Sequence, residues 1–134
     1  MSKDRFIERQ VEVRNATVRL LEAVAEPESA IVRDAVIQRF EFSFELVWKT
    51  LKLYLEWQGH ECGGPRPTLK KAFSEGLIGD TEEADLWLRM LEDRNLTSHA
   101  YDEALATRIY RHVAKDYAAL LGAMAQKIQT LPWE

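Results

Sequence analysis

A fixed cation, a titratable imidazole and a phenol lie close together in this sequence, between Arg94 and Tyr101. Arginine stays charged at physiological pH, and its planar N–H groups can bind two phosphate oxygens at once. Histidine titrates near neutral pH, so His99 can pass a proton to or from a hydroxyl. These residue types suit phosphodiester chemistry, and no other segment of the sequence combines them so closely.

The spacing of these residues requires a particular local structure. On an uninterrupted α-helix, at ~100° per residue, Arg94 and His99 would lie ~140° apart, while Arg94 and Tyr101 would nearly coincide. All three converge only if a helix ends or bends between Arg94 and Tyr101. The Asn, Thr and Ser residues in this stretch favour such a break, because their side chains compete for backbone hydrogen bonds. Asp102 is then the predicted N-cap of the next helix.

A purely structural interpretation fits the same segment. Arg94 would then pair with a neighbouring carboxylate such as Glu92 or Asp93. His99 would cap a helix, and Tyr101 would pack with its hydroxyl outward. Residue types alone do not decide between this interpretation and a catalytic one.

Length and composition predict one domain spanning residues 1–134. A hydrophobic content of 46% and four Trp exclude general disorder. No apolar run approaches the ~20 residues that a membrane span needs, so no membrane partner is expected. The N-terminus continues directly into an amphipathic pattern without the features of a secretion signal, which predicts a cytoplasmic protein.

The net charge of −4 argues against a protein that coats nucleic acid through a broad basic surface. An RNA substrate would instead require a small basic groove, formed by Arg94 with Arg89, Arg108, Arg111 and Lys115. The single Cys and three scattered His show no metal-ligand spacing, so neither a metal nor another cofactor is expected.

Apolar residues recur every three or four positions along most of the chain, and no period-two run competes with them, so the predicted class is all-α. Four long helices and one short helix are expected. Their predicted ranges are 3–25, 28–58, 68–76 with Thr68 as its cap, 82–95 after a cap at Asp80 or Thr81, and 103–129. Pro27 and Gly59 end the first two helices, and a Gly/Pro-rich stretch at 63–67 is the only clear linker.

The predicted helix 28–58 carries apolar residues on two faces. One face holds Phe40, Phe44, Val47, Trp48, Leu51 and Leu55, and the other holds Phe42, Leu46, Leu53 and Trp57. The second set is more than a small monomer normally exposes, which favours a self-association surface. A central helix that is surrounded within its own monomer explains the pattern equally well.

Two further residues with chemical potential are left outside the candidate site. Cys62 lies in the linker region with only His60 nearby, which is typical of an incidental thiol. His112 stands beside the apolar Val113, which is typical of a surface or boundary position.

The motif Arg94-x4-His99-x-Tyr101 resembles the Arg-x4-His-x-Tyr signature of HEPN domains that are paired with minimal nucleotidyltransferases. Three ordered blocks extend the resemblance to the family called nucleotidyltransferase substrate-binding protein. These blocks are 33–52, 72–78 and 94–103. The resemblance implies an antiparallel up-and-down bundle that forms a homodimer, with two copies of the Arg/His segment at a shared cleft. It also implies a separately encoded minimal nucleotidyltransferase as partner.

The family resemblance implies two different functions. In the favoured one, the chain is a metal-independent endoribonuclease toxin in which Arg94 orients the scissile phosphate and His99 shuttles the proton. Asn95 supports a phosphate oxygen or fixes the junction, and Tyr101 accepts AMP from the antitoxin partner. The 2′-hydroxyl would be the nucleophile, so RNA and not DNA is the expected substrate. In the alternative, the chain is a non-catalytic substrate-binding subunit of the nucleotidyltransferase.

Overall fold

The computed structural model describes residues 2–133, which contain helices and no β-strand. The helices are α1 (Ser2–Ala25), α2 (Ala30–Trp57), α3 (Pro65–Ser74), α4 (Thr81–Leu96), α5 (Glu103–His112) and α6 (Ala118–Thr130). A 3-10 turn, Thr97–His99, follows α4, and a π-helical turn, Val113–Tyr117, joins α5 to α6 in one continuous rod. The prediction of an all-α chain with four long helices and one short one is therefore confirmed.

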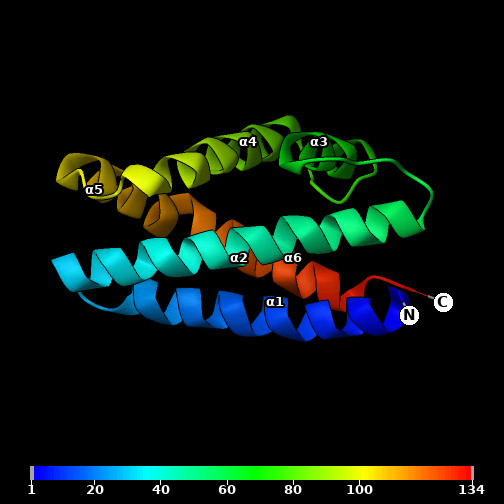
Figure 1. The fold of residues 1–134 in the computed structure, drawn as a ribbon, viewed down its shortest axis with the longest axis horizontal. Coiled ribbons are helices and arrows are strands. Elements are labelled where there is room, and N and C mark those ends of the chain that lie inside the picture. The colour runs from blue at the N-terminus through cyan, green and yellow to red at the C-terminus, as the bar shows by residue number, and fades with distance from the viewer. Residues whose placement is uncertain (1, 134) are drawn as a thin grey trace.

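The four long helices run alternately up and down (Figure 1). α1 and α2 form an antiparallel hairpin, and α4 returns antiparallel to α2 on its other side. The α5–α6 rod then crosses behind α2 and ends beside the start of α1 (Figure 1). Because α1, α3, α4, α5 and α6 all contact α2, this helix is the centre of the bundle.

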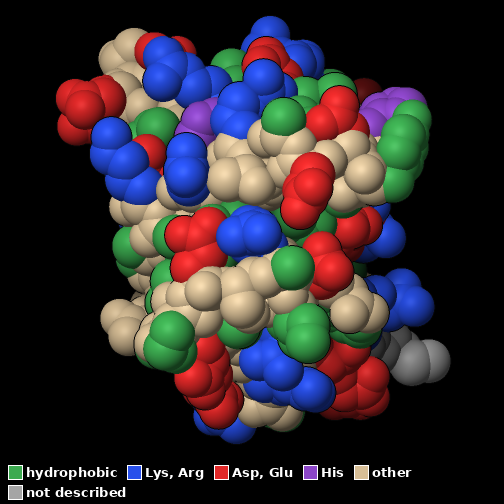
Figure 2. Space-filling view, turned by 90° about the vertical axis from the view of Figure 1, so that its left-hand side faces the viewer, with side chains coloured by type: hydrophobic (Ala, Val, Ile, Leu, Met, Phe, Trp, Pro, Cys, Tyr) green, Lys and Arg blue, Asp and Glu red, His purple; other side chains and the backbone are tan. Residues whose placement is uncertain are grey.

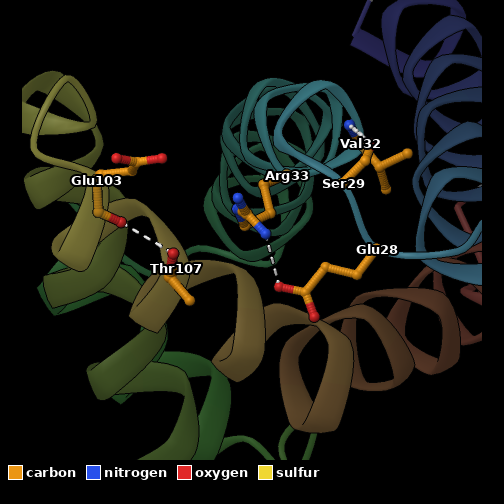
Figure 3. A network of polar contacts seen from close by, with 6 residues as sticks. All are labelled: Glu28, Ser29, Val32, Arg33, Glu103 and Thr107. Atoms are coloured by element: carbon orange, nitrogen blue, oxygen red, sulfur yellow. Dashed lines mark hydrogen bonds and ion pairs between the residues drawn. The ribbon is translucent and has the colours of Figure 1, made fainter.

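Most helix boundaries follow from local capping residues. Asp80 caps α4 by accepting a hydrogen bond from Glu83 N at 2.9 Å, as expected. Ser29 caps α2 by accepting from Val32 N at 3.1 Å, and Arg33 Nη1 reaches Glu28 Oε2 at 2.9 Å beside it (Figure 3). The second helix therefore begins at Ala30, two residues later than predicted.

The start of α3 differs from the prediction. The helix begins at Pro65, three residues before the expected cap at Thr68. Proline is favoured in the first turn because that position needs no N–H partner and φ is already helical. Thr68 lies inside the helix and its hydroxyl donates to Gly64 O at 2.8 Å. Gly76, with φ +82°, closes the turn that follows.

The buried apolar side chains form one continuous core along α2. The first predicted face of α2 lies in it, with Phe40, Phe44 and Leu51 fully buried. The second face is divided, because Leu46 is buried whereas Phe42 remains 64% exposed. A central position in the monomer thus covers part of this face and leaves Phe42 on the surface. Within residues 2–133, no helix is long and apolar enough to cross a membrane.

Candidate functional site

Arg94 lies in the last turn of α4 and faces α2. Its Nε is 3.7 Å from Glu45 Oε2, and its side chain is partly exposed. The same Glu45 oxygen accepts a hydrogen bond from Trp48 Nε1 at 2.9 Å, which fixes the carboxylate on the surface of α2. The partner of Arg94 is therefore a carboxylate of another helix, rather than Glu92 or Asp93 as the structural interpretation supposed.

The surroundings of Arg94 form a shallow groove between α2 and its neighbours. Two more cations line it, Arg9 of α1 and Lys49 of α2, together with Glu41 and the exposed Phe42. Arg94 Nε is buried and makes no hydrogen bond within the described part of the chain. Nε therefore faces the Glu45 carboxylate at 3.7 Å, beyond hydrogen-bond distance, so this ion pair holds the guanidinium only loosely.

His99 and Tyr101 lie at the junction that follows α4. The helix ends at Leu96, and Thr97 Oγ1 donates to Arg94 O at 2.7 Å as the 3-10 turn begins. His99 Nδ1 is 3.4 Å from the Tyr101 hydroxyl oxygen, and the two rings meet edge to face. Both side chains are exposed, and Tyr101 is 85% exposed. The predicted helix end between Arg94 and Tyr101 is confirmed.

The junction brings two of the three signature residues together. His99 contacts Tyr101, whereas no hydrogen bond or ion pair in residues 2–133 joins Arg94 to either of them. Asn95 is exposed, and its carbonyl oxygen lies 3.5 Å from Ser98 Oγ. Asp102 caps α5 as predicted, because its carboxylate accepts from Ala104 N at 3.0 Å.

A second polar cluster, which sequence reasoning missed, surrounds Asp93. Its Oδ2 is 2.7 Å from His112 Nδ1 and 2.7 Å from the Tyr117 hydroxyl. Asp93 is only 7% exposed, whereas the His112 side chain is 44% exposed. Burial raises the pKa of Tyr117, and the hydrogen bond to Asp93 and the charge of Asp93 raise it further. The phenol therefore stays protonated and donates to the carboxylate.

The π-turn explains how His112 and Tyr117 reach the same carboxylate. On a regular α-helix these two residues would lie ~140° apart. The wider turn of a π-helix, with its i→i+5 hydrogen bonds, rotates Tyr117 back onto the side of His112. Their rings meet edge to face, with centroids 6.0 Å apart. No residue type marks a π-turn in a sequence, so the apolar pattern over 103–129 predicts only a regular helix.

The basic residues considered as one groove are divided between two surfaces. Arg94 lines the α2 groove, whereas Arg108, Arg111 and Lys115 are exposed along the α5 rod. Arg108 and Arg111 are three residues apart on α5 and so lie on one helix face, and Lys115 follows them in the π-turn. Figure 2 shows Lys and Arg side chains gathered around a histidine on the upper left of the end where α5 begins.

Cys62 lies at neither cluster. The residue is buried, and burial raises the pKa of its thiol, with Glu56 raising it further. Such a thiol is a poor nucleophile. In residues 2–133 no group of three or more His, Cys, Asp or Glu side chains is placed to hold a metal ion.

Residues 8–130 match the family described as "Nucleotidyltransferase substrate binding protein like". The chain belongs to this family. Membership agrees with the Arg94–Tyr101 signature and with the ordered blocks that carry the resemblance.

One similar protein is named for an activity. The chain is 34% identical over 93 residues to "Probable ribonuclease HepT" of Haemophilus influenzae (strain ATCC 51907 / DSM 11121 / KW20 / Rd). The match covers 63% of this chain and spans only 62% of the length of that protein.

The fold of the family is also seen in a solved structure. A crystal structure of a protein from Thermus thermophilus superimposes with a TM-score of 0.79 at 40% identity. It covers 87% of this chain and 98% of the other. The helical bundle described above is therefore shared along nearly the whole of that relative.

Proposed function

We propose that this chain is the HEPN subunit of a two-component toxin–antitoxin module and acts as a metal-independent endoribonuclease. The observation that carries the proposal is an exposed imidazole, His99, at a helix junction that begins with the groove-lining Arg94. Family membership and the ribonuclease name of the Haemophilus relative support it. The partner in this module is a minimal nucleotidyltransferase.

The two side chains divide the chemistry between them. Arg94 binds the non-bridging oxygens of the scissile phosphate and neutralises the charge that builds up on them. His99 takes the proton from the ribose 2′-hydroxyl, whose oxygen attacks phosphorus, and the proton is then delivered to the leaving 5′-oxygen. The products are a 2′,3′-cyclic phosphate and a free 5′-hydroxyl. DNA lacks the nucleophile and is not cut.

A homodimer completes the proposed site. In one copy Arg94 is paired with Glu45 of α2 and, among residues 2–133, forms no hydrogen bond or ion pair with His99. Two copies that meet over the α2 groove would cover the exposed Phe42 and bring two Arg/His segments to one cleft. The apolar Phe42 at the rim of a charged groove is the kind of anchor that a self-complementary interface uses.

Tyr101 is the proposed point of control by the partner. Its phenol is 85% exposed and its oxygen lies 3.4 Å from His99 Nδ1. The partner transfers AMP from ATP to this oxygen, which loses its proton while pyrophosphate leaves. The added phosphate and nucleoside then block RNA beside His99 by their size and by like-charge repulsion.

The proposal is tested with purified protein, without partner, on single-stranded RNA in the presence of a chelator. We expect cleavage that yields a cyclic phosphate end, and no cleavage of DNA of the same sequence. His99→Ala should abolish the cut, while His60→Ala, a histidine that pairs with Glu75 far from the junction in sequence, should retain it. Absence of cleavage, or equal cleavage by the His99→Ala protein, contradicts the nuclease assignment.

The family description itself favours one alternative, a non-catalytic subunit that presents substrate to the nucleotidyltransferase. In that case the chain should form a stable complex that raises nucleotidyl transfer onto a third molecule. An AMP adduct confined to Tyr101 after incubation with partner and ATP argues against this alternative.

A further inference from the structure

The cluster around Asp93 has the organisation of a built binding site rather than of a core contact. An ionised carboxylate has no proton to donate, and the Tyr117 hydroxyl already donates to Oδ2 at 2.7 Å. His112 Nδ1, also 2.7 Å from Oδ2, must therefore carry its proton toward Asp93. This fixes the imidazole in one orientation, with Nε2 on the opposite edge of a ring that is 44% exposed. In the protonated imidazolium, which carries a proton on both nitrogens, Nε2 can donate to a phosphate oxygen while Nδ1 keeps its contact with Asp93.

The fixed imidazole stands within a basic helix face. Arg108, Arg111 and Lys115 are exposed, and within residues 2–133 none of them forms an ion pair. Nε2 of His112 likewise makes no hydrogen bond inside the described chain. From Arg108 to Lys115 the face is at most ~10 Å long, at 1.5 Å per residue in α5 and less through the wider π-turn, so it can contact more than one phosphate of one strand.

Charged residues on α4 and in the π-turn also lie near this face. Arg89, one turn before Asp93 on α4, is close enough to lower the pKa of Tyr117 against the larger effect of burial. Asp116, in the π-turn itself, acts in the opposite direction. Asp93 is engaged by two donors, and the exposed Arg89 adds a cation of α4 to the three of the α5 rod, beside the exposed Glu92 and the partly exposed Asp116.

We propose that His112, held by Asp93 and Tyr117 and flanked by Arg108, Arg111 and Lys115, is a second phosphate-binding site that docks the backbone of single-stranded RNA. The inference rests on the proposed ribonuclease function and adds to it. RNA held along the α5 rod is held on the helix that begins directly after His99 and Tyr101. Arg94 and His99 then act on one phosphate, while this face holds others.

A binding assay separates this proposal from the nuclease assignment. Anisotropy of a fluorescein-labelled single-stranded RNA is measured with the His99→Ala protein in chelator, so cleavage does not enter. Adding Arg108→Gln, Arg111→Gln and Lys115→Gln together should weaken binding more than tenfold at low salt. The slope of log K against log salt should fall by ~0.7 for each phosphate that the protein no longer neutralises.

The matched control removes three exposed cations elsewhere, Arg14, Arg66 and Lys70, by the same change to Gln. It lowers net charge equally but should alter affinity and salt slope much less. If both triple variants weaken binding alike, the effect is one of net charge and the docking site is overturned. Unchanged binding in the α5 triple variant overturns it as well.

The role of His112 itself is tested by His112→Asn, because the Asn amide nitrogen can take the place of Nδ1. This variant keeps the hydrogen bond to Asp93 but lacks Nε2, so its melting temperature should stay close to that of the parent. RNA affinity should fall about fivefold, as expected for the loss of one hydrogen bond. Affinity equal to the parent would show that His112 only satisfies Asp93. A wild type that does not cleave RNA but shows these binding effects would reject the nuclease and keep the docking site.

Discussion

Two pairs of residues in this molecule share the same sequence spacing and reach opposite arrangements. Arg94 and His99 are five residues apart, as are His112 and Tyr117. An α-helix would point the members of each pair ~140° apart. After α4 the helix ends and a 3-10 turn follows, whereas between α5 and α6 the helix widens into a π-turn.

The helix end after α4 and the π-turn between α5 and α6 differ in how tightly they hold their side chains. At the helix end, the one side chain of the described residues to which His99 forms a hydrogen-bond contact is the exposed Tyr101, at 3.4 Å. At the π-turn, His112 and Tyr117 both reach the buried Asp93 at 2.7 Å. Ending a helix exposes residues that a substrate or a modifying enzyme can reach, while widening it keeps the rod intact and fixes the side chains. In the functions proposed above, the chemistry and the modification belong to the exposed junction after α4, and the docking of RNA belongs to the rigid cluster at the π-turn.

The largest expected effect concerns the exposed junction at the end of α4, from Arg94 to Tyr101, which is called the open region below. Arg94→Lys keeps the charge but removes the planar pair of donors that binds two phosphate oxygens. We expect RNA cleavage by this variant to fall about 100- to 1000-fold, the range for loss of one transition-state donor. The measurement is kcat/KM on an RNA oligonucleotide in chelator, with Arg14→Lys as a matched control. Stability should hardly change, because the Arg94 side chain is partly exposed and its Glu45 contact is 3.7 Å long.

If the Arg94→Lys protein cleaves RNA at the normal rate, then cleavage requires only a positive charge at this position and not the planar donor pair of arginine. The open region would then be no more specialised than the α5 face, and the contrast between the two would disappear.

The next effect concerns the stability that comes from the fixed region, the cluster of Asp93, His112 and Tyr117. Asp93→Ala leaves the Tyr117 hydroxyl without its acceptor in a buried setting, and His112 without the partner of Nδ1. The expected loss in the free energy of unfolding is about 1–3 kcal/mol, the cost of an unsatisfied buried group. His99→Ala should change it by less than about 0.5 kcal/mol, as surface substitutions do. Denaturant unfolding of the two variants side by side makes the comparison, and equal losses would contradict it.

Tyr117 also makes the free energy of unfolding depend on pH. Burial raises the pKa of its phenol above the ordinary value of about 10, so the unfolded chain releases this proton first as pH rises. The stability that Tyr117 contributes is therefore fully present below pH ~10 and is lost above it, by up to ~1.4 kcal/mol per pH unit. Tyr117→Phe should cost about 1 kcal/mol near neutral pH and should lack this alkaline loss.

Unfolding midpoints of wild type and Tyr117→Phe, measured between about pH 8 and 11 on either side of the ordinary phenol pKa, provide the test. If the difference between the two unfolding midpoints stays constant across this range, the Tyr117 phenol ionises equally in the folded and unfolded states. That result would contradict the effect expected from its burial beside Asp93.

Sequence patterns predict the parts of this structure that depend on neighbouring residues. Asp80 and Asp102 cap their helices as expected because a cap bonds to the next few backbone N–H groups. The helix end after Arg94 is predictable for the same reason. The core face of α2 follows from its period.

The contacts that define both sites are not local. Arg94 meets Glu45 of another helix, and Asp93 meets His112 and Tyr117 across 19 and 24 residues of sequence. Such pairs depend on how the helices pack, which apolar periodicity does not specify. In sequence His112 resembles an ordinary surface residue because it stands beside Val113, and nothing in its own segment points to Asp93.

The smallest expected effect is the one that separates the two tyrosines. Tyr101 is 85% exposed and its only hydrogen-bond contact in the described chain is the long one to His99, so Tyr101→Phe should leave stability within about 0.5 kcal/mol of wild type. Because the phenol takes no part in the proposed proton transfer, RNA cleavage without partner should also persist. What should disappear is the AMP adduct formed with partner and ATP, measured by intact mass, while Tyr110→Phe, a buried tyrosine, should still be modified. If the adduct still forms on the Tyr101→Phe protein, the modified residue is not Tyr101. The proposed control of cleavage through Tyr101 would then be wrong, while the proposed roles of Arg94 and His99 would be unaffected.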